Sequence, residues 1–358
     1  MQVDDDSESS ETVEFLTTAG GFFAGCFALY GALTYAGVEE VLAGNLVLLA
    51  LCAIGAYLLF FDGGATQAAL QAQAVQQVAM EEGDIMDQAS RIELERVSAD
   101  KLLSNPAAAA ATLASDGVLR IDGALTQSTA ASLLAQINSE LESAIMKAKE
   151  DLAADTKYFG DVLARRNRHD LYLDLTPEVK AALTEALCPL KAVLSDVLGR
   201  DAELFELSAL ISDPKSPRQP VHPDTPFREG EGTAVLTAFV ALQDIDDAMG
   251  PTFFLPGSHT GDAHAAFNSR DDGGREKIAL LRETPNARGL LETGDITLFD
   301  SRLLHGGGEN ESARRRVLFY FSFRAKGVRA PPGSLLYQLR RQHTLDQSDD
   351  WLAQPAMA

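Results

Sequence analysis

The chain contains little cysteine. Three of its 358 residues are cysteine, and no two of them form a CxxC pair. Cys26 and Cys52 lie inside apolar stretches, and Cys188 lies alone in a helical pattern. This spacing excludes a disulfide framework and the usual cysteine-based zinc sites. It favours a reducing, cytosol-like compartment for the domain that carries the chemistry.

Basic residues are also scarce. The chain has 30 Lys and Arg against 52 Asp and Glu, which gives a formal net charge of −22. Nucleic acid is bound through clustered Lys and Arg, so this composition argues against a nucleic-acid partner. It does not exclude a small anionic ligand, because a few local cations can override the field of the whole chain. The sequence has no repeat of fixed period, and no feature marks an obligate protein partner.

The first basic residue is Arg91, so the N-terminus lacks the positively charged leader of a secretory signal. Residues 1–14 form an acidic tail instead, and two long uncharged stretches follow between residues 15 and 61. Each stretch reaches the roughly 20 residues that cross a bilayer as a helix, and Gly21 and Gly25 permit close helix contact. We expect a two-helix membrane hairpin over residues 15–61; a pair of buried helices in a soluble domain is the alternative.

The rest of the chain divides by pattern. The Ala- and Gln-rich residues 62–105 favour a helical stalk, residues 106–330 carry the patterns of a folded domain, and residues 331–358 form a tail. Within the domain, apolar residues recur at helical spacing over 126–141 and 177–198, and short apolar or alternating runs follow. Helices followed by short strands predict an α+β fold, in which a jelly-roll or cupin-like double sheet is backed by helices. The expected strands are 118–121, 204–211, 234–242, 252–255, 296–304 and 317–323.

The most informative motif is His222-Pro223-Asp224, followed far downstream by His305. Residues two apart on an extended segment point to the same side, so His222 and Asp224 are able to face one ligand together. Two histidines and one carboxylate occupy one face of an octahedral Fe(II) ion and leave three positions open. His222, Asp224 and His305 are therefore the candidate catalytic residues and metal ligands.

Arg316 opens the apolar run Val317–Phe323, after a Gly-rich segment at residues 306–312. Such a segment between two apolar runs predicts a hairpin loop, which would return Arg316 beside His305. A guanidinium donates two parallel hydrogen bonds to a carboxylate. A metal triad with a cation at this offset is typical of an Fe(II)- and 2-oxoglutarate-dependent oxygenase.

With these residues in hand, the segment from about Ser115 to Phe323 resembles the phytanoyl-CoA dioxygenase (PhyH-like) family. The resemblance implies a double-stranded β-helix fold with Fe(II) and 2-oxoglutarate. It matches His222, Asp224 and His305 to the iron ligands, and Arg316 to the arginine that pairs with the distal carboxylate of 2-oxoglutarate. The motifs that carry it are Gln219–Asp224, Phe239–Asp244, Met249–Pro251, Leu255–His259, Gly294–Asp300 and His305–Gly308.

The chain departs from the family pattern at a few positions. Phe239 stands beside the expected co-substrate where the family often has Trp, and Met249 stands where it often has Asn. The family also has a basic residue in its N-terminal half that helps to hold the co-substrate, and Arg168 or Arg166 matches it. Arg168, Phe239, Gln219 and Arg316 form the expected co-substrate set.

The sequence thus predicts a membrane-anchored Fe(II)- and 2-oxoglutarate-dependent dioxygenase. It would hydroxylate a small molecule or a lipid and release succinate and CO2, with ascorbate as a further candidate cofactor. The presence of Asp224 favours hydroxylation over halogenation, because a halide needs that ligand position. One alternative is a catalytically silent double-stranded β-helix that acts as a membrane-tethered binding or scaffold module. Another is a cupin-type metalloenzyme without 2-oxoglutarate, whose metal binding would be indifferent to Arg316→Ala.

Overall fold

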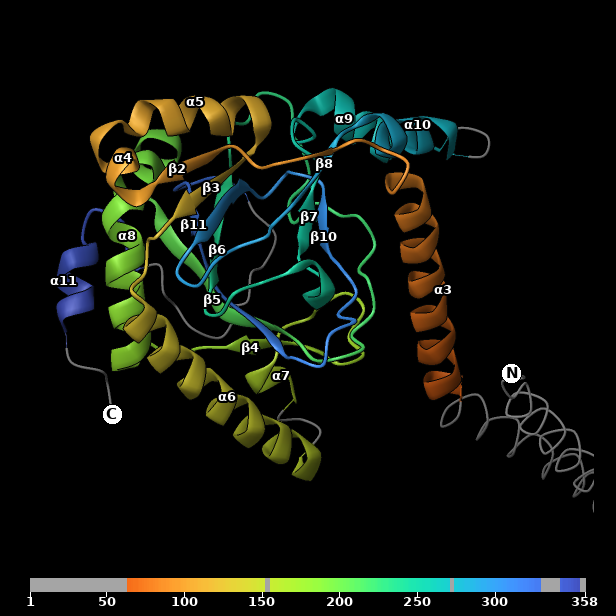
Figure 1. Cartoon of the computed structure of the whole chain (residues 1–358), viewed down its shortest axis with the longest axis horizontal. Coiled ribbons are helices and arrows are strands. Elements are labelled where there is room, and N and C mark those ends of the chain that lie inside the picture. The colour runs from red at the N-terminus through yellow and green to blue at the C-terminus, as the bar shows by residue number, and fades with distance from the viewer. Residues whose placement is uncertain (1–62, 152–154, 271–273, 330–341, 355–358) are drawn as a thin grey trace, which may run out of the picture. The chain divides into compact units, whose positions relative to one another are not determined.

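The computed structural model describes residues 63–151, 155–270, 274–329 and 342–354, and the backbone alone over residues 63–71. The chain separates into two compact units, residues 1–73 and residues 74–358. All that follows concerns the second unit, together with the helix that leads into it (Figure 1).

A seven-stranded sheet forms the larger part of the β structure. Its strands are antiparallel neighbours except for the parallel pair β2–β3 at one edge. In spatial order they are β2 (Arg96–Ser98), β3 (Val118–Asp122), β9 (Ile296–Asp300), β6 (Val235–Ala241), β11 (Arg316–Arg324), β5 (Glu203–Ser212) and β4 (Arg168–Tyr172). The sheet thus brings together segments from both ends of the unit.

A four-stranded sheet faces the first one. Its strands, in spatial order, are β1 (Arg91–Ile92), β8 (Asn286–Arg288), β7 (Thr252–Phe254) and β10 (His305–Gly307). Apolar side chains from the two sheets pack against each other between them, as when the rings of Phe254 and Phe299 meet at 5.3 Å. The chain passes from one sheet to the other between β9 and β10 and back again before β11. The fold is therefore mixed α+β, with a double sheet as its centre.

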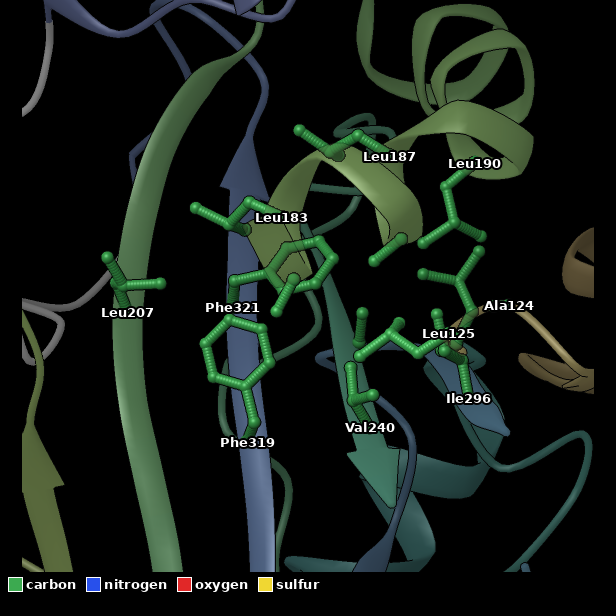
Figure 2. Packing of buried hydrophobic residues seen from close by; sticks show 14 of the residues in the cluster. Ala124, Leu125, Leu183, Leu187, Leu190, Leu207, Val240, Ile296, Phe319 and Phe321 are labelled. Atoms are coloured by element: carbon green, nitrogen blue, oxygen red, sulfur yellow. The ribbon is translucent and has the colours of Figure 1, made fainter. Parts of the chain in front are cut away.

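Helices cover the outer face of the seven-stranded sheet. The long helix α8 (Pro177–Leu198) begins at Thr176, whose side chain accepts a hydrogen bond from the Val179 N–H. Its apolar side turns Leu183 and Leu187 toward Phe319 and Phe321 of β11 (Figure 2). The other helices whose buried side chains join this cluster are α4 (Ala99–Ser104), α5 (Pro106–Asp116), α6 (Gln127–Glu150) and α11 (Ser348–Ala353).

Strand periodicity separates this apolar core from the interior between the sheets. Along β11, Val317, Phe319, Phe321 and Phe323 face the helices and are buried in their cluster. Because side chains alternate along a strand, the residues between them, from Arg316 to Ser322, face the four-stranded sheet. The polar residues of the interior therefore lie on one face of a sheet whose other face is held rigidly by the helices.

Helix α3 (Gly63–Met86) precedes the β structure, and the short helices α7 (Asp155–Tyr158), η3 (Asp247–Met249), α9 (Gly261–Phe267) and α10 (Arg275–Glu283) lie in its connections. Met86 is buried in a cluster with residues of β7 and α10. Leu94 and Leu102 are buried in the two larger clusters. Much of the predicted stalk, residues 62–105, therefore packs with the domain; the domain boundary at residue 106 stays a prediction.

The predicted membrane location is contradicted. Within the described residues no helix combines the length and the apolarity needed to cross a bilayer. Helix α3 has 24 residues, but it is rich in Gln and carries Glu81, Glu82 and Asp84 near its end, whereas a spanning helix needs about 20 predominantly apolar residues. The two uncharged stretches of residues 15–61 lie outside the described residues. We do not retain the hairpin as an anchor.

Candidate active site

The structure brings His222, Asp224 and His305 together at the edge of the interior. His222 and His305 exchange two backbone hydrogen bonds of 2.9 and 3.0 Å, so β10 holds the segment that carries His222. The Asp224 N–H donates to the Ser301 carbonyl at 2.8 Å. The Oδ1 atom of Asp224 lies 3.9 Å from His222 Nε2 and 3.7 Å from His305 Nε2. Backbone hydrogen bonds to Ser301 and His305 thus place the side chains of His222, Asp224 and His305 close together.

Hydrogen bonds fix the orientation of both imidazole rings. His222 Nδ1 contacts the Pro220 carbonyl at 2.8 Å, and His305 Nδ1 contacts the Leu303 carbonyl at 2.9 Å. A carbonyl accepts, so each Nδ1 carries the proton and each Nε2 presents a lone pair to the other ligands. Burial lowers the pKa of each ring to about 4, and in His222 repulsion by His305 contributes to this value. Both histidines are therefore neutral near pH 7, as a metal requires.

This donor set fits a divalent metal ion. One ligand atom from each residue lies within 4.8 Å of the others, and ligands adjacent on an ion with bonds of ~2.1 Å are separated by about 3 Å. A small inward movement of the side chains closes that difference. Two imidazoles and one carboxylate, with open positions toward a cavity, are the ligands of a non-haem Fe(II) oxygenase site.

Two arginines lie buried deeper in the interior. Arg316, on β11, is 0% exposed and Arg168, on β4, is 2% exposed. Both donate to the Ser212 hydroxyl, Arg168 Nε at 3.2 Å and Arg316 Nη2 at 3.1 Å. Burial lowers the pKa of Arg316 to about 10 and that of Arg168 to about 9, the latter also through repulsion by Arg316. Both remain cations at neutral pH.

Within the described part of the chain, no carboxylate neutralises the two guanidiniums. Arg168 and Arg316 donate to carbonyl and hydroxyl oxygens, and among the described residues neither forms an ion pair with a carboxylate. The Nε atom of Arg316 is buried without any hydrogen-bond partner there. Buried charges are costly unless they are paired. An anion of suitable shape, such as the distal carboxylate of 2-oxoglutarate, supplies what this pair lacks.

Gly307 leaves space in front of the arginines. A Cβ atom at Gly307 would lie 3.4 Å from the Nη2 atoms of both Arg168 and Arg316 and 2.6 Å from Gln219 Oε1. Gln219 Oε1 accepts the Gly307 N–H at 2.8 Å, and its amide group donates to the Leu163 carbonyl. Gln219, expected in the co-substrate set, thus lines the cavity and also holds β10 in place.

A cavity of about 320 Å³ joins these groups. Phe239, on β6, lines it and makes edge contacts with Phe299 and Tyr320, whose ring centroids lie 4.9 and 5.7 Å away. The predicted residues His222, Asp224, His305, Phe239 and Gln219 all line this cavity, and the arginines lie behind Gly307. Arg166 forms no part of the lining.

Sequence reasoning missed an acidic part of the wall. Asp170 is buried on β4 and accepts a hydrogen bond of 2.9 Å from the Tyr320 hydroxyl. Glu206, on β5, accepts one of 2.5 Å from Ser322. Burial raises the pKa of Asp170 to about 7. Alternation along β4 places Asp170 on the same side as Arg168, but the sequence shows no clear strand pattern there, and the pairing of β4 with β5 brings Asp170 to the cavity.

The predicted hairpin between His305 and Arg316 is wrong. His305 lies on β10, which pairs with β7 in the four-stranded sheet. Arg316 lies on β11, which pairs with β5 and β6 in the other sheet. The Gly-rich residues 306–312 therefore cross between the sheets. The two side chains approach one another across the interior and not along a ladder of backbone bonds.

Facing sheets, a triad of two histidines and a carboxylate, and buried arginines beyond it define the non-haem Fe(II) and 2-oxoglutarate-dependent class of oxygenase. The chain belongs to the phytanoyl-CoA dioxygenase (PhyH) family, whose sequence model matches residues 113–318. The family is one of 2-oxoglutarate-dependent non-haem iron dioxygenases, which assigns Fe(II) and 2-oxoglutarate as cofactors.

Two characterised relatives illustrate the match. The dioxygenase trt7 of Aspergillus terreus is 26% identical over 225 residues, which cover 59% of this chain and 71% of the relative. The peroxisomal phytanoyl-CoA dioxygenase of Rattus norvegicus is 29% identical over 109 residues. That alignment covers 28% of this chain and 32% of the rat protein, about a third of its length.

Solved structures with a similar arrangement include the α-ketoglutarate-dependent epimerase SnoN from nogalamycin biosynthesis. It is 22% identical, has a TM-score of 0.45, and the match covers 63% of this chain and 93% of SnoN. HygX from Streptomyces hygroscopicus, solved with nickel, 2-oxoglutarate and hygromycin B, is 19% identical with a TM-score of 0.43. That match covers 61% of this chain and 86% of HygX.

Proposed function

We propose that this chain hydroxylates a small molecule at a site in which His222, Asp224 and His305 hold Fe(II). The observation that carries the proposal is the convergence of the three ligand atoms beside two buried arginines that have no carboxylate partner among the described residues. The two facing sheets support a double-stranded β-helix as the core. Succinate and CO2 are the products of the co-substrate.

Different groups in and beside the cavity supply oxygen activation, co-substrate binding and the exclusion of water. Bound Fe(II) supplies oxygen activation coupled to the oxidative decarboxylation of 2-oxoglutarate. Arg316 and Arg168 bind the distal carboxylate and orient the co-substrate toward the triad. The buried rings of Phe239 and Phe299 exclude water from that region. Asp224 occupies the ligand position that a halide would need, which favours hydroxylation.

The wall of the cavity also limits the substrate. It carries the carboxylates of Asp161, Asp170, Glu206 and Asp224, and no described Lys or Arg lines it. A CoA thioester brings several phosphate charges, which proteins bind through cations. We infer that the substrate is neutral or carries an amine, and that it bears no phosphate where it enters the cavity.

An optical experiment tests the cofactor assignment. Fe(II) and then 2-oxoglutarate are added without oxygen to the full chain, and the weak visible charge-transfer band of a chelated keto acid is measured. We expect a band in the wild type that disappears in Asp224→Ala, and no change in it when palmitoyl-CoA is added. Folded, iron-loaded wild type without a band would instead support the alternative, a catalytically silent binding or scaffold module.

A further inference from the structure

Helix α3 lies outside the part of the chain that the family model matches, yet its last turns reach the candidate active site. Glu82 on this helix is 5% exposed, whereas its neighbour Glu81 is exposed. A buried carboxylate is costly unless it is paired and hydrogen-bonded. The partners of Glu82 therefore indicate what it does.

Both carboxylate oxygens of Glu82 have partners from distant segments. The Val221 N–H donates to Glu82 Oε2 at 2.6 Å, and Val221 directly precedes His222. The Lys277 ammonium group, on α10, lies 2.7 Å from Glu82 Oε1. The first contact is a charge-assisted hydrogen bond, a strong class of bond in proteins, and the second is an ion pair in which Oε1 accepts no hydrogen bond. The pair of contacts fixes the backbone at the residue next to a metal ligand.

The packing around Glu82 points to the same segment. Met86, one turn further along α3, is buried in a cluster with Val221, Phe253, Leu255, Leu281 and Leu304. Val221 and Leu304 are the residues immediately before His222 and His305. The Asn286 side chain also donates to the Met86 carbonyl at 3.0 Å, which ties the end of α3 to β8. The cluster thus packs against the residues that precede both histidines, and α3 contributes Met86 to it.

Three backbone N–H groups of the segment that carries His222 donate to two neighbouring elements, β10 and α3. The Gln219 N–H donates to the Gly307 carbonyl at 2.8 Å, the Val221 N–H to Glu82, and the His222 N–H to the His305 carbonyl at 2.9 Å. Two of these bonds come from β10. The third hydrogen bond, from the Val221 N–H to Glu82, is made with α3, which lies outside the residues that the family model matches. Metal sites tolerate errors of about 0.2 Å in ligand distance.

We propose that Glu82 is a positioning residue, which holds Val221 so that His222 Nε2 keeps facing the ligand atoms of Asp224 and His305. This inference rests on the proposed function, since it takes the triad to be the iron site. It makes the helix N-terminal to the family region a working part of the active site. Groups that support a metal ligand from behind typically contribute 10- to 100-fold to metal affinity.

Fe(II) affinity of the full-length protein tests the proposal. Anaerobic titration, followed through the charge-transfer band with 2-oxoglutarate, is compared between wild type, Glu82→Met and Glu82→Gln. Met keeps the length of the side chain but offers no comparable acceptor, so we expect the Fe(II) Kd to rise about tenfold. Gln keeps an acceptor oxygen for Val221 without the charge, and its Kd should fall between the two. Glu81→Ala, on the exposed side of the same turn, is the matched control and should leave Kd unchanged.

The outcomes distinguish a failure of the proposed iron site from a failure of the role proposed for Glu82. No Fe(II) binding in the wild type would defeat the proposed function itself. Normal binding in the wild type and equal Kd in folded Glu82→Met, even with a lower melting temperature, would make Glu82 a structural residue only and overturn the inference. Should Glu82→Met fail to fold, Glu82→Gln decides together with amide exchange at Val221. An unchanged Kd and unchanged protection of that amide would overturn the inference equally.

Discussion

At the scale of single residues, Arg168 and Arg316 stand out because burying two neighbouring cations in the interior costs free energy. Each is almost completely buried, and the two share one hydroxyl, that of Ser212. Like charges in a region of low dielectric repel each other strongly. Because neither arginine forms an ion pair with a carboxylate among the described residues, we propose that the pair is a preformed site for the distal carboxylate of the co-substrate.

We predict that Arg316→Ala raises the concentration of 2-oxoglutarate needed for half-saturation. Removing one partner of a buried, hydrogen-bonded charge pair costs about 2 kcal/mol or more, which corresponds to roughly thirtyfold in Kd. The measurement is a titration of the charge-transfer band. Arg315→Ala is the control, because Arg315 pairs with Asp213 away from the cavity. Equal affinity in wild type and Arg316→Ala would show that Arg316 does not hold the co-substrate, whereas metal binding without any band in either protein would favour a cupin-type metalloenzyme without 2-oxoglutarate.

The buried carboxyl of Asp170 leads to a prediction about how the stability of the protein depends on pH. Burial raises its pKa from the ordinary 3.8 to about 7, so the folded state binds a proton more readily than the unfolded state. The stability that Asp170 contributes is then present at low pH and is lost as pH rises toward 7. We expect the free energy of unfolding of Asp170→Asn, relative to wild type, to increase by roughly 3 kcal/mol between pH 5 and pH 8.

Urea unfolding of both proteins across this range measures the difference. The comparison with a matched variant is needed because the two histidines act in the opposite sense. Their lowered pKa values make the metal-free protein lose stability as pH falls from about 6.5 toward 4. Parallel stability curves for wild type and Asp170→Asn would show that the buried carboxyl does not titrate in this way.

At the scale of elements, local pattern predicted the long helices α6 and α8 and the strands β3, β5, β6, β7, β9 and β11, but neither the shorter elements nor the pairing of the strands. The helix expected over 177–198 is α8, and the run expected over 317–323 lies within β11. Both have a clear periodicity along one side, which sequence alone displays. The connection after His305 was mistaken for a hairpin because a Gly-rich loop looks the same whether it reverses within one sheet or crosses to another. That choice depends on tertiary packing.

The same distinction explains which site residues were found. His222 and Asp224 are two residues apart, so local geometry predicted that they act together; the chemistry of a two-histidine, one-carboxylate triad with a cation indicated His305 and Arg316, and the family resemblance matched both. Asp170 comes to the cavity only through the pairing of β4 with β5. Glu82 comes to it through α3, which lies far from the site in sequence. Neither position stands in a recognisable motif.

A third prediction concerns Gly307 on the short strand β10. A methyl group at Gly307 would crowd Gln219 and fill the space in front of both guanidiniums. We expect Gly307→Ala to weaken 2-oxoglutarate binding about tenfold and to cost roughly 1–3 kcal/mol of stability, as overpacking does. Gly232→Ala is the control, because a Cβ there meets no atom within 4 Å. Titration and thermal unfolding of both variants check this; unchanged affinity in Gly307→Ala would place the co-substrate elsewhere.

At the scale of the whole molecule, the site is assembled from both sheets. His305 belongs to the four-stranded sheet and Arg316 to the seven-stranded sheet. A metal and a co-substrate held between them add contacts that exist only in the folded state. The stability of the domain and the occupation of its site are therefore coupled.

We predict that Fe(II) with 2-oxoglutarate, added without oxygen, raises the melting temperature of the protein. Ligand present at 100 times its Kd stabilises the folded state by about 2.7 kcal/mol. Differential scanning fluorimetry measures the shift, and Asp224→Ala should show little of it. An equal shift in Asp224→Ala would mean that the metal binds somewhere other than the triad.

The burial gradient along the cavity has a kinetic consequence. Arg316 is fully buried, whereas the side chain of Asp224 is 41% exposed and that of Asp161 is 98% exposed. A molecule seated among the acidic residues therefore stands between solvent and the arginines. On the proposed function, we therefore expect ordered exchange, with 2-oxoglutarate entering first and succinate leaving last. An inhibitor that occupies only the exposed end will be uncompetitive with respect to 2-oxoglutarate.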